Sequence, residues 1–115
     1  MAASTSRPAR DAGASVDLPP LDPVIHQPTR LRILALLYRN RRAAFTWVRD
    51  ALGLTDGNLG SHAAKLAEAA YIDQGRVLTT TGFQVWLRMT PKGDEAFRAY
   101  LDALKAYLEI ESDPA

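Results

Sequence analysis

Two short apolar segments separated by a glycine lie between residues 46 and 70 of this chain. The first segment ends at Leu52, and Gly53 stands where a residue in the left-handed conformation can close a helix. The second segment repeats apolar residues at intervals of four, three and four, which predicts that they lie on the side of a helix that faces the core: Leu59, Ala63, Leu66 and Ala70. The spacing therefore predicts two helices joined by a tight glycine turn.

Residues suited to helix capping stand before three predicted helices. Thr46 precedes the first short helix, whose inner side is predicted to carry four apolar residues: Trp47, Val48, Ala51 and Leu52. Thr55 precedes the second, with Asp56 at the positive end of the helix dipole. Thr90 and Pro91 predict the start of a last helix that runs to about residue 109.

An alternating segment, residues 71–89, follows the second short helix. Every second residue near its end is apolar, which predicts a half-buried strand over residues 83–89: Val85, Leu87 and Met89. Residues 76–78 are predicted to form the partner strand and residues 79–82 the hairpin tip, with Gly82 available for a positive φ. Upstream, a helix is predicted to begin at residues 27–29, and residues 43–45 are expected to form a very short strand.

The order of these elements predicts a mostly α fold with a small β-hairpin (α+β). It is the order of a winged helix-turn-helix, in which the second helix of the pair reads DNA. One domain is predicted over residues 21–110. Residues 1–20 contain almost no large apolar residue and are predicted to be a disordered tail, and residues 111–115 a second short tail.

Composition excludes several classes of function. The chain has 115 residues and no Cys, which removes structural disulfides, thiolate metal sites and a Cys nucleophile, and fits a cytoplasmic protein. No apolar run approaches the ~20 residues of a membrane span. His26 and His62 lack the spacing of metal ligands, and no nucleotide-binding or nucleophile motif occurs. We therefore expect no enzyme, no metal site and no cofactor.

The charges are unevenly distributed, although the net charge is only +1. Residues 30–92 hold ten basic and four acidic side chains, a balance of +6, whereas residues 93–115 hold two basic and six acidic ones, a balance of −4. A basic central region and an acidic last helix favour an interaction with a polyanion through the former.

The outer side of the second short helix is the main candidate for DNA contact. Its polar and small residues suit base edges and phosphates, and the candidates are Thr55, Asp56, Gly57, Asn58, Ser61, His62 and Lys65. Gly57 and Gly60 each cost roughly 0.8–1 kcal/mol relative to Ala in a helix, which is reasonable if a backbone approaches a duplex closely. The alternative is an ordinary solvated helix surface.

Further basic residues are candidates for phosphate contacts: Arg30, Arg41, Arg42, Arg49, Arg76 and Arg88. The predicted hairpin tip has no cation of its own, so a solvated hairpin that only closes the core stays open as an alternative. Trp47, Trp86 and Tyr38 could line a small-molecule pocket, although such residues are more often core or interface.

The last helix carries a wide apolar surface. Six large residues cover close to half of its circumference: Phe97, Tyr100, Leu101, Leu104, Tyr107 and Leu108. One edge is expected to pack on its own domain and the rest to pair with the same helix of a second subunit. The alternative is that all six belong to the intramolecular core.

Several motifs together resemble one known family. They are the start of the second short helix at residues 54–59, the first helix at 28–34, the pairs Ser61-His62 and Lys65-Leu66, and residues 69–72 and 87–93. In these the chain is similar to the winged helix domains of small MarR/ArsR-like transcriptional regulators. Gly60 and Ala70 depart from the family, where a polar residue and Gly are usual, and the hairpin tip lacks the usual cations.

This resemblance implies a cytoplasmic, homodimeric regulator that is joined through its terminal helices. The sequence thus predicts a DNA-binding transcriptional regulator that reads double-stranded DNA at a pseudo-palindromic operator through the major groove. The second hypothesis is a winged helix that binds another protein without sequence-specific DNA binding. Neither the operator nor a small-molecule effector can be named from the sequence.

Overall fold

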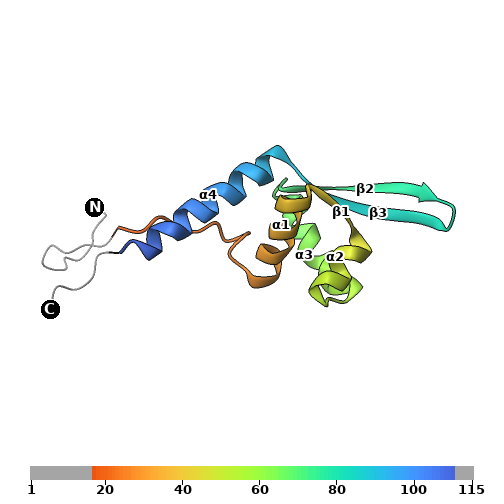
Figure 1. Cartoon of the computed structure of the whole chain (residues 1–115), viewed down its shortest axis with the longest axis horizontal. Helices are drawn as coiled ribbons and strands as arrows, with labels where there is room; N and C mark the ends of the chain where they lie inside the picture. Colours follow the sequence, from red (N-terminus) through yellow and green to blue (C-terminus); the bar gives the residue numbers. More distant parts are fainter. Residues whose placement is uncertain (1–16, 111–115) are drawn as a thin grey trace, which may run out of the picture.

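The structure, a computed structural model, describes residues 17–110 of the chain. In this part it has four helices and three strands: α1 (Pro28–Asn40), β1 (Arg42–Ala44), α2 (Phe45–Leu52), α3 (Asp56–Glu68), β2 (Ile72–Thr79), β3 (Gly82–Met89) and α4 (Pro91–Leu108). Figure 1 shows α1, α2 and α3 gathered at the centre, with α4 extending to one side and the hairpin of β2 and β3 to the other. The predicted fold class, a winged helix with a small sheet, is confirmed.

The sheet is antiparallel and β3 is its central strand, in the order β1-β3-β2. Ala43 of β1 pairs with Leu87 of β3, and Ile72 of β2 pairs with Met89. All four of these side chains are buried. Because directly opposite residues point to the same face of a sheet, this end of the sheet contributes one apolar face to the core.

The core is built mainly from helix positions with three- and four-residue spacing. The buried residues of the helices are Ile33, Leu34, Leu37, Val48, Leu59, Ala63, Leu66, Phe97 and Tyr100. Ile25, which precedes α1, is also fully buried. Three of the four positions predicted to face inward on α3 are therefore confirmed, and the buried positions of α1 and α3 fix which sides of these helices remain free.

The predicted helix caps of α3 and α4 are confirmed. The Thr55 hydroxyl accepts a hydrogen bond from the Asn58 amide (3.0 Å), and that of Thr90 accepts one from the Gly93 amide (2.9 Å). Gly53 closes α2 with φ 66°. The predicted cap at Thr46 is wrong, because β1 runs directly into α2 and Ala44 occupies the capping position without a side-chain hydrogen bond.

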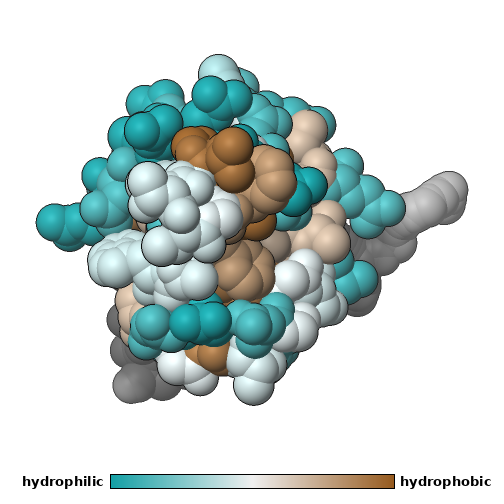
Figure 2. Space-filling model, turned by 90° about the vertical axis from the view of Figure 1, so that its right-hand side faces the viewer, coloured by the Kyte–Doolittle hydropathy of each residue, from teal (hydrophilic) through white to brown (hydrophobic). Residues whose placement is uncertain are grey.

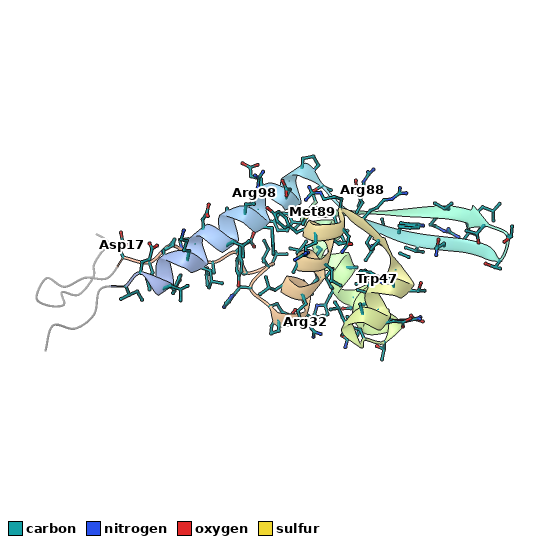
Figure 3. The ribbon with its side chains drawn as sticks, viewed as in Figure 1. Asp17, Arg32, Trp47, Arg88, Met89 and Arg98 are labelled. Carbon is teal, nitrogen blue, oxygen red and sulfur yellow. The ribbon has the colours of Figure 1, made fainter. Side chains whose placement is uncertain are left out.

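Two residues predicted on the inner side of α2 lie outside. Trp47, which is labelled in Figure 3, is 48% exposed, and Ala51 is exposed as well. Val48 is fully buried and Leu52 partly buried. The number of apolar residues in so short a helix does not show which of them the rest of the domain covers, and here it covers only one narrow side.

Ala70 was predicted to lie in a helix and to face the core, and both expectations are wrong. Helix α3 ends at Glu68, and Ala70 is exposed with φ 65°. Its left-handed conformation allows the amide of Tyr71 to donate to the carbonyl of Leu66 (2.9 Å), which ends the helix in a reversed turn.

The start of α4 is packed against the end of that turn. The Thr90 hydroxyl donates to the Ala70 carbonyl (2.7 Å) and the Thr90 amide to the Tyr71 carbonyl (3.1 Å). Gly93 is buried, and a Cβ atom there would overlap the Tyr71 carbonyl group. Only glycine therefore allows α4 to begin this close to the backbone that follows α3.

The chain segment before α1 lies along α4. The Tyr107 hydroxyl donates to the Pro19 carbonyl (2.8 Å), and the Tyr100 hydroxyl lies 2.9 Å from Nδ1 of His26. Residues 17–20, the end of the predicted disordered tail, thus include a residue that contacts α4. The rest of that tail, residues 1–16, and the second tail, 111–115, lie outside the described residues.

Candidate nucleic-acid interface

The outer face of α3, the side opposite its buried residues, and its flank bring together five of the thirteen predicted DNA-contacting residues. With Leu59, Ala63 and Leu66 inward, the helical period places these residues outward: Gly57, Ser61, Ala64, Lys65 and Glu68. Asn58 is exposed and His62 partly exposed on one flank. Glu68 was not among the predicted site residues, although the same spacing could have placed it there. The face is narrow, polar and composed largely of small side chains.

An ion-pair cluster lies at the N-terminal end of α3. The Arg49 guanidinium contacts Asp50 (2.9 Å) and Asp56 (2.8 Å). The hydrogen bonds to these carboxylates raise the pKa of Arg49 above its ordinary value, and the one from Arg49 lowers the pKa of Asp50. A phosphate that binds Arg49 would have to compete with two carboxylates.

Arg30 and His62 connect the start of α1 to α3. The Arg30 guanidinium donates to the Val24 carbonyl (2.6 Å) and lies 3.2 Å from Nδ1 of His62. Burial, and then the charges of Arg30 and Lys65, lower the pKa of His62. Because arginine can only donate, Nδ1 accepts and the ring carries its proton on Nε2. His62 is thus a neutral hydrogen-bond donor beside the outer face of α3.

The other predicted basic residues are spread over the sheet and α1. Arg41 is paired with Asp94 (3.2 Å) and Arg88 with Asp73 (2.8 Å). Two more lie over aromatic rings, with Arg42 at 4.9 Å from the Trp86 ring and Arg76 at 4.4 Å from that of Phe83. Lys65 forms no ion pair with any residue between 17 and 110, and it is exposed. Lys65 is therefore the predicted cation best placed for a phosphate.

The wing, defined as β2, β3 and the turn between them, carries large apolar residues that the sequence analysis did not single out. Leu78 is 70% exposed, Phe83 64% and Val77 51%. At the tip, the Thr79 hydroxyl donates to the Gly82 carbonyl (2.6 Å), and Gly82 has the expected positive φ of 122°. The signal for this surface was present in the Val-Leu pair directly before the threonine run.

Some of the large apolar residues of α4 are covered by the rest of the domain, and others are exposed. Phe97 and Tyr100 are buried in the core, and Tyr107 contacts the segment before α1. The remaining large apolar residues of the predicted dimer interface are exposed: Leu101, Leu104 and Leu108. The half of α4 that projects from the helices in Figure 1 therefore has one covered side and one free apolar stripe.

Two of the three aromatic residues considered for a small-molecule pocket lie together, and the third does not. Trp47 and Trp86 border a shallow hollow of about 320 Å³ with Arg42, whereas Tyr38 stacks on Phe97 with ring centroids 5.0 Å apart. Among the described residues, no three His, Asp or Glu side chains are grouped so as to hold a metal ion. In the same part of the chain, no helix has the length and apolar character to cross a membrane.

Several known proteins are similar to this chain in sequence and fold. The family model described as winged helix DNA-binding domain matches residues 29–108. An uncharacterised protein of Methanocaldococcus jannaschii is 32% identical over 78 residues, which cover 68% of this chain and 85% of that protein. The structure of a transcriptional regulator homologue from Pyrococcus horikoshii OT3 matches with a TM-score of 0.71 and 29% identity, covering 75% of this chain and 85% of that one.

A more distant structure, that of overoxidized AbfR bound to DNA, has a TM-score of 0.62 at 15% identity and covers 70% of this chain and 58% of that one, which shows the fold alone. The family match extends from α1 to the end of α4 and takes in more than half of the chain. The resemblance stated from the sequence motifs is thereby confirmed. The chain belongs to the family of winged helix DNA-binding domains, and its structural relatives are transcriptional regulators.

Proposed function

We propose that this protein is a homodimeric transcriptional regulator that acts in the cytoplasm and reads a pseudo-palindromic operator with α3 in the major groove. The family supports DNA binding by a regulator. The observation that carries the finer proposal is the pair of glycines on α3, for which the chain itself offers no explanation.

Gly57 and Gly60 both lie within α3, where glycine is unfavourable by roughly 0.8–1 kcal/mol relative to Ala. A Cβ atom at either position would meet nothing within 4 Å, and neither residue has a positive φ. Neither packing nor backbone conformation therefore requires glycine. A surface from which Cβ atoms are absent suits a helix whose backbone approaches a partner closely.

The residues around these glycines have the chemistry of groove recognition. Asn58 can form two hydrogen bonds with adenine, and Ser61 can bond either a base edge or a phosphate. The Nε2–H of His62 can donate to a base acceptor, and Lys65 can pair with a phosphate. AbfR, which shares the fold, has been solved bound to DNA, and this supports DNA as the partner here.

A second subunit would cover the free stripe of α4. Leu101, Leu104 and Leu108 recur at three- and four-residue spacing on the projecting half of the helix. The same stripes on two helices can pack together around a two-fold axis. The dimer would then present two copies of α3 to two half-sites, which supports an operator with two-fold symmetry.

The test is selection of duplexes of about 30 base pairs from a random pool by the full chain, followed by titration of binding with salt. We expect an enriched, symmetric sequence and a steep loss of affinity with salt. Lys65→Ala should reduce the salt slope by about one, whereas Lys105→Ala, a control on the projecting part of α4, should leave the slope unchanged. Equal slopes for Lys65→Ala and the unchanged chain would refute the phosphate contact.

A wing tip without a cation at residues 79–82 and a net charge of only +1 favour a second candidate function, a winged helix that binds another protein. A folded dimer that enriches no duplex and shows no salt-sensitive binding would support this candidate over DNA reading.

A further inference from the structure

The apolar face that packs the sheet onto the helices continues beyond them into the wing. Near the helices this face is buried at Ile72, Leu87 and Met89. Further out, Val85 is partly buried, and Leu78 and Phe83 are opposite each other in register and mostly exposed. Directly opposite residues share a face of the sheet, and every second residue along a strand points to the same face. These side chains therefore all lie on the side of the sheet that faces the helices.

One member of this exposed pair, Phe83, lies beside α2. Phe83 and Val85 border a shallow hollow of about 280 Å³ together with Phe45 and Thr46 at the start of α2. Figure 2, viewed from the hairpin end of the molecule, shows apolar residues gathered near the middle of this side, with hydrophilic residues around them. The wing therefore turns its apolar face toward the side of the molecule on which the helix pair lies.

The charges on this face suit a polyanion. Its side chains between residues 74 and 85 include one cation, Arg76, which lies over the Phe83 ring at 4.4 Å, and no carboxylate. The wing's carboxylate, Asp73, lies on the opposite face and is paired with Arg88 (2.8 Å). A negatively charged partner would meet no repulsion at Leu78 and Phe83.

The size of the patch selects among partners. A stable protein interface takes roughly 20–30 residues from each side, far more than two side chains at a hairpin tip. In contrast, one or two apolar side chains are enough to enter a minor groove and partly unstack a base step. The opposite face of the same strand, at Val77, lacks this pairing of two large side chains, because Val77 is opposite Gln84.

We propose that the wing is an apolar wedge for the minor groove, in which Leu78 and Phe83 press between base pairs beside the half-site contacted by α3. The inference rests on the proposed function, since it needs α3 on the DNA. Arg76 supplies the adjacent cation for a phosphate or the groove floor. Such a wing would favour flexible pyrimidine–purine steps at positions flanking the half-site and would bend the duplex there.

The test uses the duplex selected from the random pool by the full chain, labelled at both ends for energy transfer. The double variant Leu78→Thr, Phe83→Thr keeps residues that favour strands. We expect it to lose about tenfold or more in affinity and to bend the duplex less, with its salt slope unchanged. The control Val77→Thr, on the other face of β2, should change neither affinity nor bend. Unaltered affinity and bend in the double variant would overturn the wedge.

Two further measurements separate the outcomes. For the unchanged protein, 2-aminopurine placed at the flanking step should brighten on binding as the step unstacks, and constant fluorescence would overturn the wedge even if the double variant fails to fold. A double variant that keeps its DNA affinity but has a lower mass in sedimentation would overturn the wedge in favour of a contact between copies.

If the unchanged protein enriches no duplex, the proposed function itself fails. Enrichment followed by equal bending in all variants defeats only the wedge.

Discussion

Helices α3 and α4 begin in the same way, yet their glycines have opposite surroundings. Each helix is capped by a threonine hydroxyl, Thr55 or Thr90, and each has a glycine in its first turn. At Gly93 a Cβ atom would overlap the Tyr71 carbonyl, whereas at Gly57 it would meet nothing. The first glycine is explained by packing inside the chain. Packing inside the chain does not explain Gly57, which supports the proposal that a partner approaches α3 closely.

The largest effect is expected from Gly93→Ala. The added methyl group would be forced against a backbone carbonyl that is held by its hydrogen bond to Thr90, so the start of α4 must move. We expect the free energy of unfolding to fall by about 3 kcal/mol, measured by urea denaturation. Gly75→Ala, where a Cβ atom meets nothing within 4 Å, is the control and should change stability little. Equal stability of both variants would contradict the crowding at Gly93.

Gly57→Ala should have two effects of opposite sign. The free energy of unfolding should rise by up to about 1 kcal/mol, because alanine is the better helix former and has room. Affinity for the selected duplex should nevertheless fall by about tenfold or more, because the methyl group would hold the backbone away from the groove. Anisotropy titration measures the second effect, with Gly75→Ala again as the control. A more stable variant with unchanged affinity would show that close backbone approach is not needed.

The smallest effect is expected from Ala70→Gly. Ala70 holds a left-handed conformation, φ 65°, that is unfavourable by about 1–2 kcal/mol for a residue with a side chain. Glycine would remove this cost, but it also gives the unfolded chain more conformational freedom, which lowers stability by about 0.4–1 kcal/mol. We therefore expect a net rise in the free energy of unfolding of up to about 1 kcal/mol, measured by urea denaturation. Ala99→Gly, at an exposed position within α4, should destabilise instead. Destabilisation by both would contradict the strain at Ala70.

The features predicted correctly from the sequence are those that depend on nearby residues. The caps at Thr55 and Thr90 and the left-handed Gly53 each involve atoms within four positions along the chain, so residue type and spacing are sufficient. Ala70 shows the limit of periodicity, because an apolar residue that continues the spacing of α3 stands beyond its end. The family motif, with glycine at this position, indicated the turn better than the spacing did.

Contacts between distant segments could not be predicted in this way. Arg41 and Asp94 are 53 positions apart, and the overlap that fixes Gly93 arises from Tyr71, 22 positions before it in the sequence. The candidate site was predicted in its main part, since the outer face of α3 follows from the helical period. The exposure of Leu78 and Phe83 depends on how far the hairpin extends past the helices. The alternation of apolar and polar residues predicts which face a side chain is on, but it does not predict where the helices stop covering that face.

The contact between the start of α4 and the Ala70 and Tyr71 carbonyls also has a geometric consequence for the proposed dimer. It fixes the direction of α4 relative to α3, the helix proposed to read DNA, because the start of α4 is bonded directly to the turn that ends α3. In that dimer, the angle at which the two copies of α4 cross would set the separation and relative rotation of the two copies of α3. Such a molecule would tolerate changes of base sequence in an operator better than the insertion of about five base pairs, which turns one half-site to the far side of the double helix.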